Sequence, residues 1–298
     1  MKNDIFLYEK VTVVIVTFKS EHIIEKCLDN IDLNYNIILV ENSDNVEFTN
    51  YLQKKYRNLN CINIGYDSGF GYALNRGIEK SKSKYIISMN PDSFPEKDCF
   101  EKLIKTADIY DDVVVVTPVT YVKNNTKEFS GYGFFKKNNA SKRNNKNQLY
   151  VDWVNGNVAL IKKSIFNKIG KFDENFFLEY EERDFQKRIF NEKKKIMIDF
   201  NAKSQHLEGK SANEKYAFEM KCEASWHHAW SKYYYYKKHY GIIYSLYLNI
   251  PMACINFLKI FIFRLLGDKK KSKLYKLFFL GFLNSLMNKK SFYRAEID

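Results

Sequence analysis

The chain is poor in cysteine, and its cysteines form no recognisable motif. The five cysteines, Cys27, Cys61, Cys99, Cys222 and Cys254, are odd in number and widely scattered, without a C-x-x-C pair. A disulfide framework and a zinc ribbon both need paired cysteines, so we expect neither, and we expect a reducing compartment. The opening segment MKNDIFLYEK has acids early and no long apolar run, which predicts no secretory signal.

Glycine-rich phosphate loops are also missing. The stretch GYDSGFG (65–71) lacks the G-x-G-x-x-G spacing of a dinucleotide-binding fold, and the first strand-like run leads into TFKS rather than into glycines. No Walker A lysine motif occurs, and no Ser-His-Asp or Cys-His arrangement is evident. We therefore look for ligand-binding residues among the acidic and small polar side chains.

Acidic residues are the minority among the charged side chains. The 48 Lys and Arg exceed the 35 Asp and Glu, which leaves a net charge of +13 at pH 7. This excess suggests a polyanionic partner: nucleic acid, an anionic membrane face or a phosphorylated substrate. Apolar residues make up 45% of the 298 positions, enough for one large α/β domain with an appendage or for two domains.

Short apolar runs alternate with amphipathic segments over the first 120 residues. The β-branched run 11–18 is typical of a strand buried on both faces, and 20–31 carries apolar residues at helical spacing after Ser20, which we expect to cap the helix. Further strands are expected at 36–45, 61–66, 84–90 and 111–119, and further helices at 49–56, 70–81 and 99–110. This alternation predicts a mostly parallel sheet with right-handed crossovers.

The alternation breaks at a polar, Asn-rich and basic segment, 122–150, which we expect to be a surface excursion. Order then resumes with a strand carrying Trp153, a helix containing Ile165 and Ile169, a helix over 178–194 that opens with acids, and a closing strand and loop over 195–211. We place the end of this domain at residue 212, so that 213–298 forms a separate region.

The region 213–298 is aromatic, basic and apolar. Its longest apolar stretch, 241–267, is interrupted by Asn249, Pro251, Asn256, Lys259 and Arg264. A bilayer-spanning helix needs about 20 predominantly apolar residues, so interfacial helices with lysines facing phospholipid head groups fit better than a span. An ordinary helical subdomain is the alternative. The segment WHHAWSKYYYYKKHY could also stack on single-stranded nucleic acid, but that would not explain the apolar stretch after it.

Small polar or acidic side chains end successive strands of the first domain. Thr17, Glu41, Asp67, Asn90 and Asp92 all lie at or just after the end of a predicted strand. In a parallel sheet the carboxyl ends of the strands meet at one edge, where ligands bind. We expect Asp92, in SMNPDSFP, to lie in an exposed loop at the strand end, and for this residue alone a plain turn and a ligand-binding role both remain open.

A carboxylate-lined edge without a glycine loop suits a nucleotide whose diphosphate is neutralised by a divalent cation, because Mg²⁺-type ions prefer oxygen ligands. A second acidic cluster, EYEERD, would place Glu181 and Asp184 on one helix face with Glu182 turned about 100° away. The same acids could simply complement the helix dipole. His206 follows the last predicted strand of this domain.

Six segments in order carry a family resemblance: VVIVTFKSEHIIEKCLDNI, IILVENSDN, GFGYALNRGI, SMNPDSFP, VNGNVALIKKSIFNKIGKFDENFFLEYEERD and HLEGKS. Together they resemble the family-2 glycosyltransferases, in particular the rhamnosyltransferase-like enzymes of polysaccharide assembly. The resemblance covers roughly residues 10–240. It implies an α/β GT-A (Rossmann-like) domain over 1–212, with a mixed, mostly parallel sheet flanked by helices, followed by a C-terminal helical, membrane-associating region over 213–298.

The resemblance also implies a nucleotide-sugar site. Thr17 and Phe18 would contact the nucleobase end, and Glu41 stands where the family usually has an aspartate for the base or ribose. Asp67 occupies a position that is often Asn. The remaining donor-site residues are Asn75 and Arg76 beneath the diphosphate, and Asn90 and Asp92 as the D-x-D element with its first acid replaced. Asp92, helped by His206, would hold Mg²⁺ or Mn²⁺.

For catalysis, the resemblance implies a carboxylate base at Glu182, where the family usually has Asp, with Glu181 and Asp184 as substitutes. Trp153, Asn155 and Gly156 would line the acceptor site. The sequence thus predicts a metal-dependent inverting glycosyltransferase of surface polysaccharide biosynthesis, using a nucleotide diphosphate sugar, with rhamnose as the candidate sugar, and a polyprenyl-linked saccharide acceptor.

We expect this enzyme in the cytoplasm, peripherally bound to the inner face of the membrane, without a nucleic-acid partner. The alternative is an inactive nucleotide-sugar-binding protein or a basic aromatic nucleic-acid-binding protein.

Overall fold

The computed structural model describes residues 8–122, 127, 143–145 and 147–297. Most of the predicted surface excursion at 122–150 therefore lies outside the described residues. The chain divides into two compact units: the first contains residues 1–172 and 185–213, and the second contains 173–184 and 214–298. A short internal segment thus groups with the C-terminal residues, whereas the boundary after residue 212 stays a prediction.

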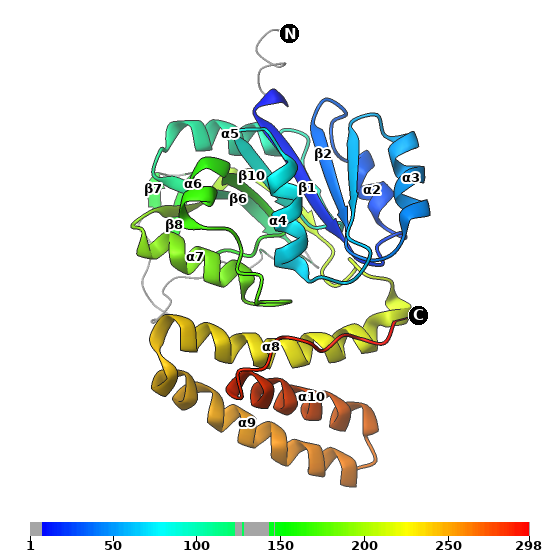
Figure 1. Ribbon diagram of the computed structural model, residues 1–298. Coiled ribbons are helices and arrows are strands. Elements are labelled where there is room, and N and C mark those ends of the chain that lie inside the picture. The colour runs from blue at the N-terminus through cyan, green and yellow to red at the C-terminus, as the bar shows by residue number, and fades with distance from the viewer. Residues whose placement is uncertain (1–7, 123–126, 128–142, 146, 298) are drawn as a thin grey trace. The chain divides into compact units, whose positions relative to one another are not determined.

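In its described part, the first unit contains a ten-stranded mixed sheet with the order β3-β2-β1-β4-β9-β6-β10-β8-β7, and β5 pairs with β10 (Figure 1). The strands are β1 (Val11–Thr17), β2 (Asn36–Glu41), β3 (Leu59–Asn63), β4 (Tyr85–Met89), β5 (Ser93–Pro95), β6 (Val113–Tyr121), β7 (Arg143–Asn145), β8 (Gln148–Val151), β9 (Val158–Lys162) and β10 (Lys195–His206). β3, β2, β1, β4, β6 and β10 run in one direction, and β9 lies antiparallel between β4 and β6. The predicted mixed, mostly parallel sheet is confirmed.

Helices cover both faces of this sheet (Figure 1). They are α2 (Ile24–Asp29), α3 (Val46–Lys55), α4 (Phe70–Lys80), α5 (Cys99–Ile109), α6 (Lys163–Ile169) and α7 (Glu181–Asn191). Alternate residues of a strand point to opposite faces, so Val13 and Ile15 pack with α2, α3 and α5, while Val14 and Val16 pack with α4, α6 and the later turns of α7.

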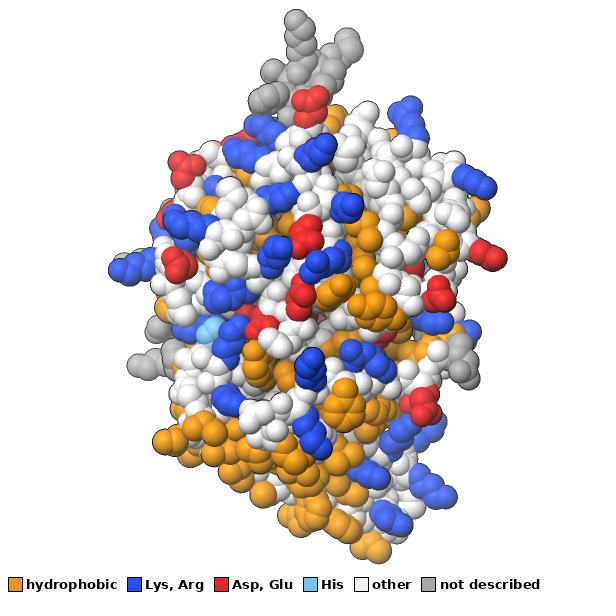
Figure 2. All heavy atoms as spheres, viewed as in Figure 1, with side chains coloured by type: hydrophobic (Ala, Val, Ile, Leu, Met, Phe, Trp, Pro, Cys, Tyr) orange, Lys and Arg blue, Asp and Glu red, His pale blue; other side chains and the backbone are white. Residues whose placement is uncertain are grey.

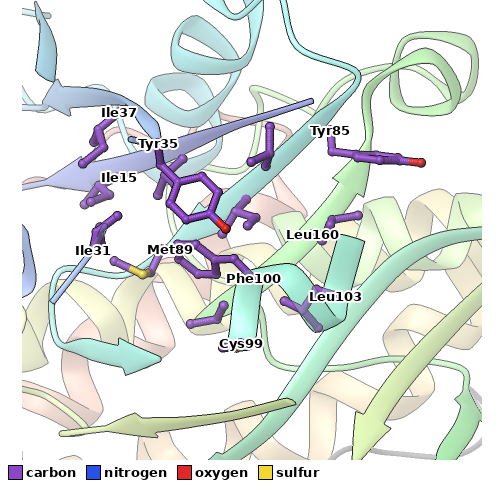
Figure 3. Packing of buried hydrophobic residues seen from close by; sticks show 14 of the residues in the cluster. Ile15, Ile31, Tyr35, Ile37, Tyr85, Met89, Cys99, Phe100, Leu103 and Leu160 are labelled. Atoms are coloured by element: carbon purple, nitrogen blue, oxygen red, sulfur yellow. The ribbon is translucent and has the colours of Figure 1, made fainter. Parts of the chain in front are cut away.

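The core beneath α5 is a mixed aromatic and aliphatic layer (Figure 3). Ile15, Ile37 and Met89 come from three neighbouring strands and are all buried. Tyr35 meets Phe100 of α5 edge-to-face, with ring centroids 5.3 Å apart. These side chains belong to one buried cluster, which joins the strands to α5 on this face of the sheet.

Three local expectations were wrong. The helix predicted at 20–31 is regular only over α2, and its first turn has no side-chain cap, because the Ser20 hydroxyl bonds to Phe18 instead. Trp153 does not lie in a strand but between β8 and β9. The short strand β5 after Asp92 was not predicted, since its three residues are too few to show a period.

The second unit contains three long helices, α8 (Ala217–Tyr240), α9 (Ile242–Leu265) and α10 (Lys269–Leu286), preceded by a short 3-10 helix, Glu214–Tyr216. Gly241 separates α8 from α9 with φ +87°, and the side chain of Asp268 caps α10 by accepting a bond from the Lys271 N–H at 2.9 Å. Trp226 and Trp230 of α8 pack with Leu277 of α10. The predicted helical character of the C-terminal region is confirmed.

Helix α9 is apolar on its exposed side. Ile243 is 82% exposed and Leu265 is 88% exposed. Figure 2 shows hydrophobic side chains gathered over the surface that α9 forms. By length and composition α9 could cross a membrane, and little of its most apolar stretch is buried.

Candidate functional site

The parallel register of β1 and β2 brings together the first predicted donor-site residues. Thr17 lies directly opposite Glu41 at the strand ends, and its hydroxyl donates to Glu41 Oε2 at 2.6 Å. The Ser43 hydroxyl donates to the other oxygen, Oε1, at 2.5 Å. Burial raises the pKa of Glu41, although these two hydroxyls act in the opposite direction. Phe18 follows at the edge and is half-buried.

The end of β2 is tied to the loop before α4 through Asn42. Its Nδ2 donates to Asp67 Oδ1 at 2.9 Å, and its Oδ1 accepts from the N–H of Ser68 at 3.1 Å. Asp67 Oδ1 also accepts from the Gly69 N–H at 3.2 Å, where φ is +86°. A left-handed backbone at this position favours glycine. Asp67 thus shapes the entry to α4.

The predicted diphosphate-side residues differ in their surroundings. Asn75 is fully buried, and both ends of its amide bond to the backbone of Phe172, with Nδ2 donating at 2.9 Å and Oδ1 accepting at 3.1 Å. A direct contact between Asn75 and a ligand would have to replace these bonds. Arg76 is half-buried, lies over the Tyr72 ring at 4.5 Å and pairs with Glu79 at 3.2 Å.

Asp92 and His206 are brought together by the strand that was not predicted. A tight turn joins β4 to β5, with the Ser93 N–H donating to Asn90 O at 3.2 Å. β5 then pairs antiparallel with the end of β10, so that Ser93 lies opposite His206. The His206 Nε2 atom lies 3.3 Å from Asp92 Oδ1.

The expectation that Asp92 lies in an exposed loop was wrong: its side chain is 1% exposed. The reason is that the chain after β10 folds over the turn, and the Lys210 N–H donates to Asp92 Oδ2 at 3.2 Å. Asp92 Oδ1, in contrast, accepts no hydrogen bond from the described residues. A buried carboxylate oxygen without a donor is costly unless a cation or proton reaches it.

The Asp92–His206 pair fits a divalent cation, because a carboxylate oxygen without a hydrogen-bond donor and an imidazole nitrogen lie 3.3 Å apart. Within the described ranges, no group of three or more His, Cys, Asp or Glu side chains could hold a metal ion. The remaining ligands would therefore have to be water and substrate oxygens, as is usual for Mg²⁺ sites that bind phosphates.

Asn157 is a neighbour of this pair that the sequence reasoning missed. Its Nδ2 lies 2.9 Å from His206 Nδ1, and its backbone carbonyl accepts from the Asn90 N–H at 2.9 Å. The antiparallel pairing of Met89 with Val158 places it there. Its only sequence signal is a polar residue just before a strand, which is common in loops.

The predicted acceptor residues Trp153, Asn155 and Gly156 lie in the segment between β8 and β9, where Trp153 is half-buried and Asn155 is exposed. This segment is held by Gln186 of α7, whose Oε1 accepts from the Val154 N–H and whose Nε2 donates to the Val154 carbonyl, both at 2.9 Å. The sequence reasoning also missed Gln186.

The predicted base residues open α7 and group with the second unit. Two consecutive residues before them, Glu179 and Tyr180, have φ values of +68° and +70°. Such backbone is unfavourable for residues other than glycine and must be held by its surroundings. The acidic turn is thus a strained entry to the helix.

The three acids of this turn have different environments. Asp184 is fully buried, and its Oδ1 lies 2.6 Å from Lys238 Nζ and 2.8 Å from His239 Nε2 of α8. Glu181 is 7% exposed, and its Oε2 has no hydrogen-bond partner among the described residues. Burial, reinforced by the nearby Glu182, raises the pKa of Glu181 well above its ordinary value. Glu182 is half-buried, and its side chain is the most accessible to solvent of the three acids.

A family model described as "Glycosyl transferase family 2" matches residues 12–170 of this 298-residue chain. Two curated proteins are similar at low identity. The low-salt glycan biosynthesis hexosyltransferase Agl10 of Haloferax volcanii is 24% identical over 193 residues, which is 60% of this chain and 61% of Agl10. The rhamnosyltransferase WbbL of Escherichia coli (strain K12) is 25% identical over 205 residues, which is 60% of this chain and 76% of WbbL.

Solved structures share the fold. The mannosyltransferase PcManGT of Pyrobaculum calidifontis, in complex with GDP-Man and Mn²⁺, aligns with a TM-score of 0.56 at 10% identity, over 94% of this chain and 88% of its own. TarS of S. aureus aligns at 0.54 and 12% identity over 96% and 93%. GalNAc-T7 with UDP, GalNAc and Mn²⁺ aligns at 0.54 and 14% over 68% of this chain and 45% of its own.

The matched part of this chain thus spans less than two thirds of Agl10 and of GalNAc-T7. At these identities the structural likeness establishes the GT-A fold and nothing finer.

Proposed function

The chain belongs to glycosyl transferase family 2, and from this premise we propose that it transfers a sugar from a nucleoside diphosphate donor to a saccharide acceptor with inversion. In such a reaction a base takes the proton of an acceptor hydroxyl, and that oxygen attacks the anomeric carbon opposite the leaving diphosphate. No covalent enzyme intermediate is required, in keeping with the absence of a Ser-His-Asp or Cys-His motif from the sequence.

The observation that carries the donor side of this proposal is the Asp92–His206 pair at the edge of the sheet, in which Asp92 is buried. A divalent cation held there would offset the charge that develops on the leaving diphosphate. Mg²⁺ and Mn²⁺ are the candidates, and the solved GalNAc-T7 and PcManGT complexes both contain Mn²⁺. The Glu41 carboxylate would bind the ribose or base.

For the base we retain Glu182. The ion pair of Asp184 with Lys238 and its contact with His239 favour a structural role for that acid. Glu181 has a raised pKa because it is buried, so at neutral pH it is a weaker candidate for an ionised base. Glu182 is more accessible than either, which supports the assignment made from the family resemblance.

The acceptor side rests on the helical unit. The exposed apolar side chains of α9 and the lysines of α10 suit an anionic membrane surface, so a polyprenyl-linked saccharide at the cytoplasmic face is the acceptor class we propose. Trp153, Asn155 and Gly156 would contact the acceptor sugar. The name of WbbL makes a rhamnose donor the first to test, with surface polysaccharide as the product.

The test is a thermal-shift panel of nucleotide sugars with Mg²⁺ or Mn²⁺, followed by donor hydrolysis with and without EDTA. A ligand that binds only the native state raises its melting temperature. We expect one donor class to stabilise the protein in a metal-dependent manner and to be hydrolysed slowly. Donor binding without any hydrolysis or transfer would instead support an inactive nucleotide-sugar-binding protein, and no donor binding at all would refute the proposal.

A further inference from the structure

The His206 ring is held between two side chains of fixed polarity. On one side, the Asn157 amide places Nδ2, which can only donate, 2.9 Å from His206 Nδ1. On the other side, His206 Nε2 lies 3.3 Å from the Asp92 carboxylate, which can only accept when ionised. If the neutral imidazole accepts from Asn157 through Nδ1, its proton lies on Nε2, 3.3 Å from Asp92 Oδ1 and without a hydrogen bond to it.

That tautomer cannot bind a cation through Nε2. Ligation by Nε2 needs its lone pair, so the ring proton must sit on Nδ1. The donor amide group of Asn157 then faces another donor. A half-turn of the Asn157 amide removes this conflict, because Oδ1 replaces Nδ2 and accepts from Nδ1–H.

We propose that Asn157 is a positioning residue that selects the tautomer of His206: one amide orientation keeps the ring proton on Nε2, and the opposite orientation moves it to Nδ1 and leaves the Nε2 lone pair for a divalent cation. This inference rests on the metal site of the proposed function. It adds that occupancy of this site is coupled to the orientation of one buried amide.

The position of Asn157 makes this coupling specific. The side chain is 4% exposed, so water competes little for His206 Nδ1. Its backbone is fixed on both sides, since its carbonyl accepts from the Asn90 N–H and the next residue, Val158, pairs with Met89. The amide can therefore turn about its own side-chain bonds while the backbone stays in place.

The first experiment reads the tautomer directly. Long-range ¹H–¹⁵N spectra of the full-length protein report which nitrogen of each of the five histidines carries the proton, and the spectrum of His206→Gln identifies the signals of His206 by their loss. We expect the Nε2–H form of His206 without metal and the Nδ1–H form with saturating Mg²⁺. The Nδ1–H form in metal-free protein would overturn the inference.

The second experiment measures Mn²⁺ binding by electron paramagnetic resonance, with Mn²⁺ alone as the probe. Asn157→Leu removes both hydrogen-bonding groups at similar volume, and we expect its dissociation constant to rise by about 10–100-fold. Asn157→Asp keeps an acceptor for Nδ1–H, so it should bind Mn²⁺ at least as tightly as the wild type. Asn58→Leu, which removes an amide donor to the Tyr35 carbonyl at the far end of β3, is the matched control and should bind normally.

The outcomes separate the two proposals. If the wild type binds no Mn²⁺, the metal part of the proposed function fails and this inference fails with it. If the wild type binds Mn²⁺ and a folded Asn157→Leu variant binds it within twofold, only the role of Asn157 is refuted. Weaker binding by Asn157→Leu together with rescue by Asn157→Asp would support it, since a purely structural role would not distinguish these variants by acceptor capacity.

Discussion

At the scale of single residues, the first unit buries carboxylates whose oxygens are not equally satisfied. Glu41 receives a hydroxyl on each oxygen, whereas Asp92 receives one backbone N–H on Oδ2 and no hydrogen bond on Oδ1 from the described residues. A satisfied carboxylate can be a rigid acceptor for a ligand, while an unsatisfied one gains most from a cation. This difference supports the proposed roles of Asp92 in metal binding and of Glu41 in ribose or base binding.

We expect Asp92→Asn to abolish or greatly reduce metal-dependent turnover while the fold is retained. Asn matches Asp in volume and can still accept from the Lys210 N–H, but it removes the charge that a cation needs. Circular dichroism and donor hydrolysis with Mn²⁺ check the two halves of this prediction. The exposed Asp98→Asn is the control, and near-normal turnover in Asp92→Asn would leave Asp92 as a turn residue.

Glu182→Gln should lower kcat by about 10²–10⁴, the range for a positioned acid–base group, with donor binding largely kept. Glu181→Gln should lower kcat less than Glu182→Gln does. Asp184→Asn should act mainly on stability, because it weakens the bond of a fully buried carboxylate to Lys238, which keeps Asp173 as its other partner, at roughly 1.5–3 kcal/mol. Steady-state transfer and thermal unfolding of the three variants check this, and a larger kcat loss in folded Asp184→Asn would move the base to that residue.

The buried Glu181 predicts a pH-dependent stability. Its pKa is raised in the folded protein, so folding favours its neutral form. The stabilisation that the neutral form provides is fully present below the pKa of Glu181 in the unfolded chain, about 4.5. It is lost as the pH rises through the pKa of Glu181 in the folded protein. Unfolding free energy should therefore decline on the alkaline side of 4.5, and Glu181→Gln should reduce this decline and raise the melting temperature at pH 8.

Melting curves from pH 4 to 9 test the Glu181 prediction, with Glu47→Gln on the exposed side of α3 as the control. Parallel pH profiles for Glu181→Gln and the wild type would contradict it.

At the scale of elements, α4 packs closely on the sheet at Gly77. A Cβ added at Gly77 would lie 2.4 Å from Val14 Cγ1 and 3.0 Å from Val40 Cγ2. Both valines are buried in β1 and β2. Glycine in this helix therefore serves a close approach of α4 to two strands, although it is an unfavourable residue for a helix interior.

Gly77→Ala should destabilise the protein by about 1–3 kcal/mol, the usual cost of overpacking, in place of the gain that Ala brings to an open helix. Chemical denaturation measures the change. Lys80→Ala, at the exposed end of the same helix, should be nearly neutral. Equal stability of Gly77→Ala and the wild type would mean that α4 can move outward at little cost.

At the scale of the whole molecule, the helical unit cannot be shortened without consequence. Ala253 of α9 and Phe282 of α10 pack with Tyr233 of α8, so removal of everything after Tyr240 would uncover the apolar side of α8. Surface substitutions on α9 are a cleaner test of membrane binding than truncation is.

We expect the full-length protein to bind anionic vesicles, less tightly as NaCl rises from about 50 to about 500 mM, because lysines near an anionic surface contribute about 1 kcal/mol each. The triple change Ile243→Gln, Leu258→Gln and Leu265→Gln, at positions 82%, 60% and 88% exposed, should greatly weaken binding and leave donor binding unchanged. Ile109→Gln, 68% exposed on α5, is the control. Equal partition of the triple variant and the wild type would leave α9 as part of a plain helical unit.

The elements of the first unit were largely readable from the sequence. Buried β-branched runs such as 11–18 and the helical spacing of 70–81 are local patterns, and their alternation restricts the sheet to parallel crossovers. These patterns were enough to place the polar residues that end β1, β2 and β4 at one edge of the sheet.

The acidic turn was also readable as the start of a helix, confirmed as α7. Its identity as the source of the base came from the family resemblance and remains a prediction.

Tertiary structure alone decided which polar groups meet. Asp92 reaches His206 only because the three residues of β5 pair with the end of β10. Asn157, which precedes His206 by 49 positions, reaches the same ring through the register of β9 on β4. Likewise, Asp184 meets His239, which lies 55 positions later in the sequence. Local propensity and periodicity report burial and element type, but the register between distant strands and helices depends on the packing of the whole core, which no single segment encodes.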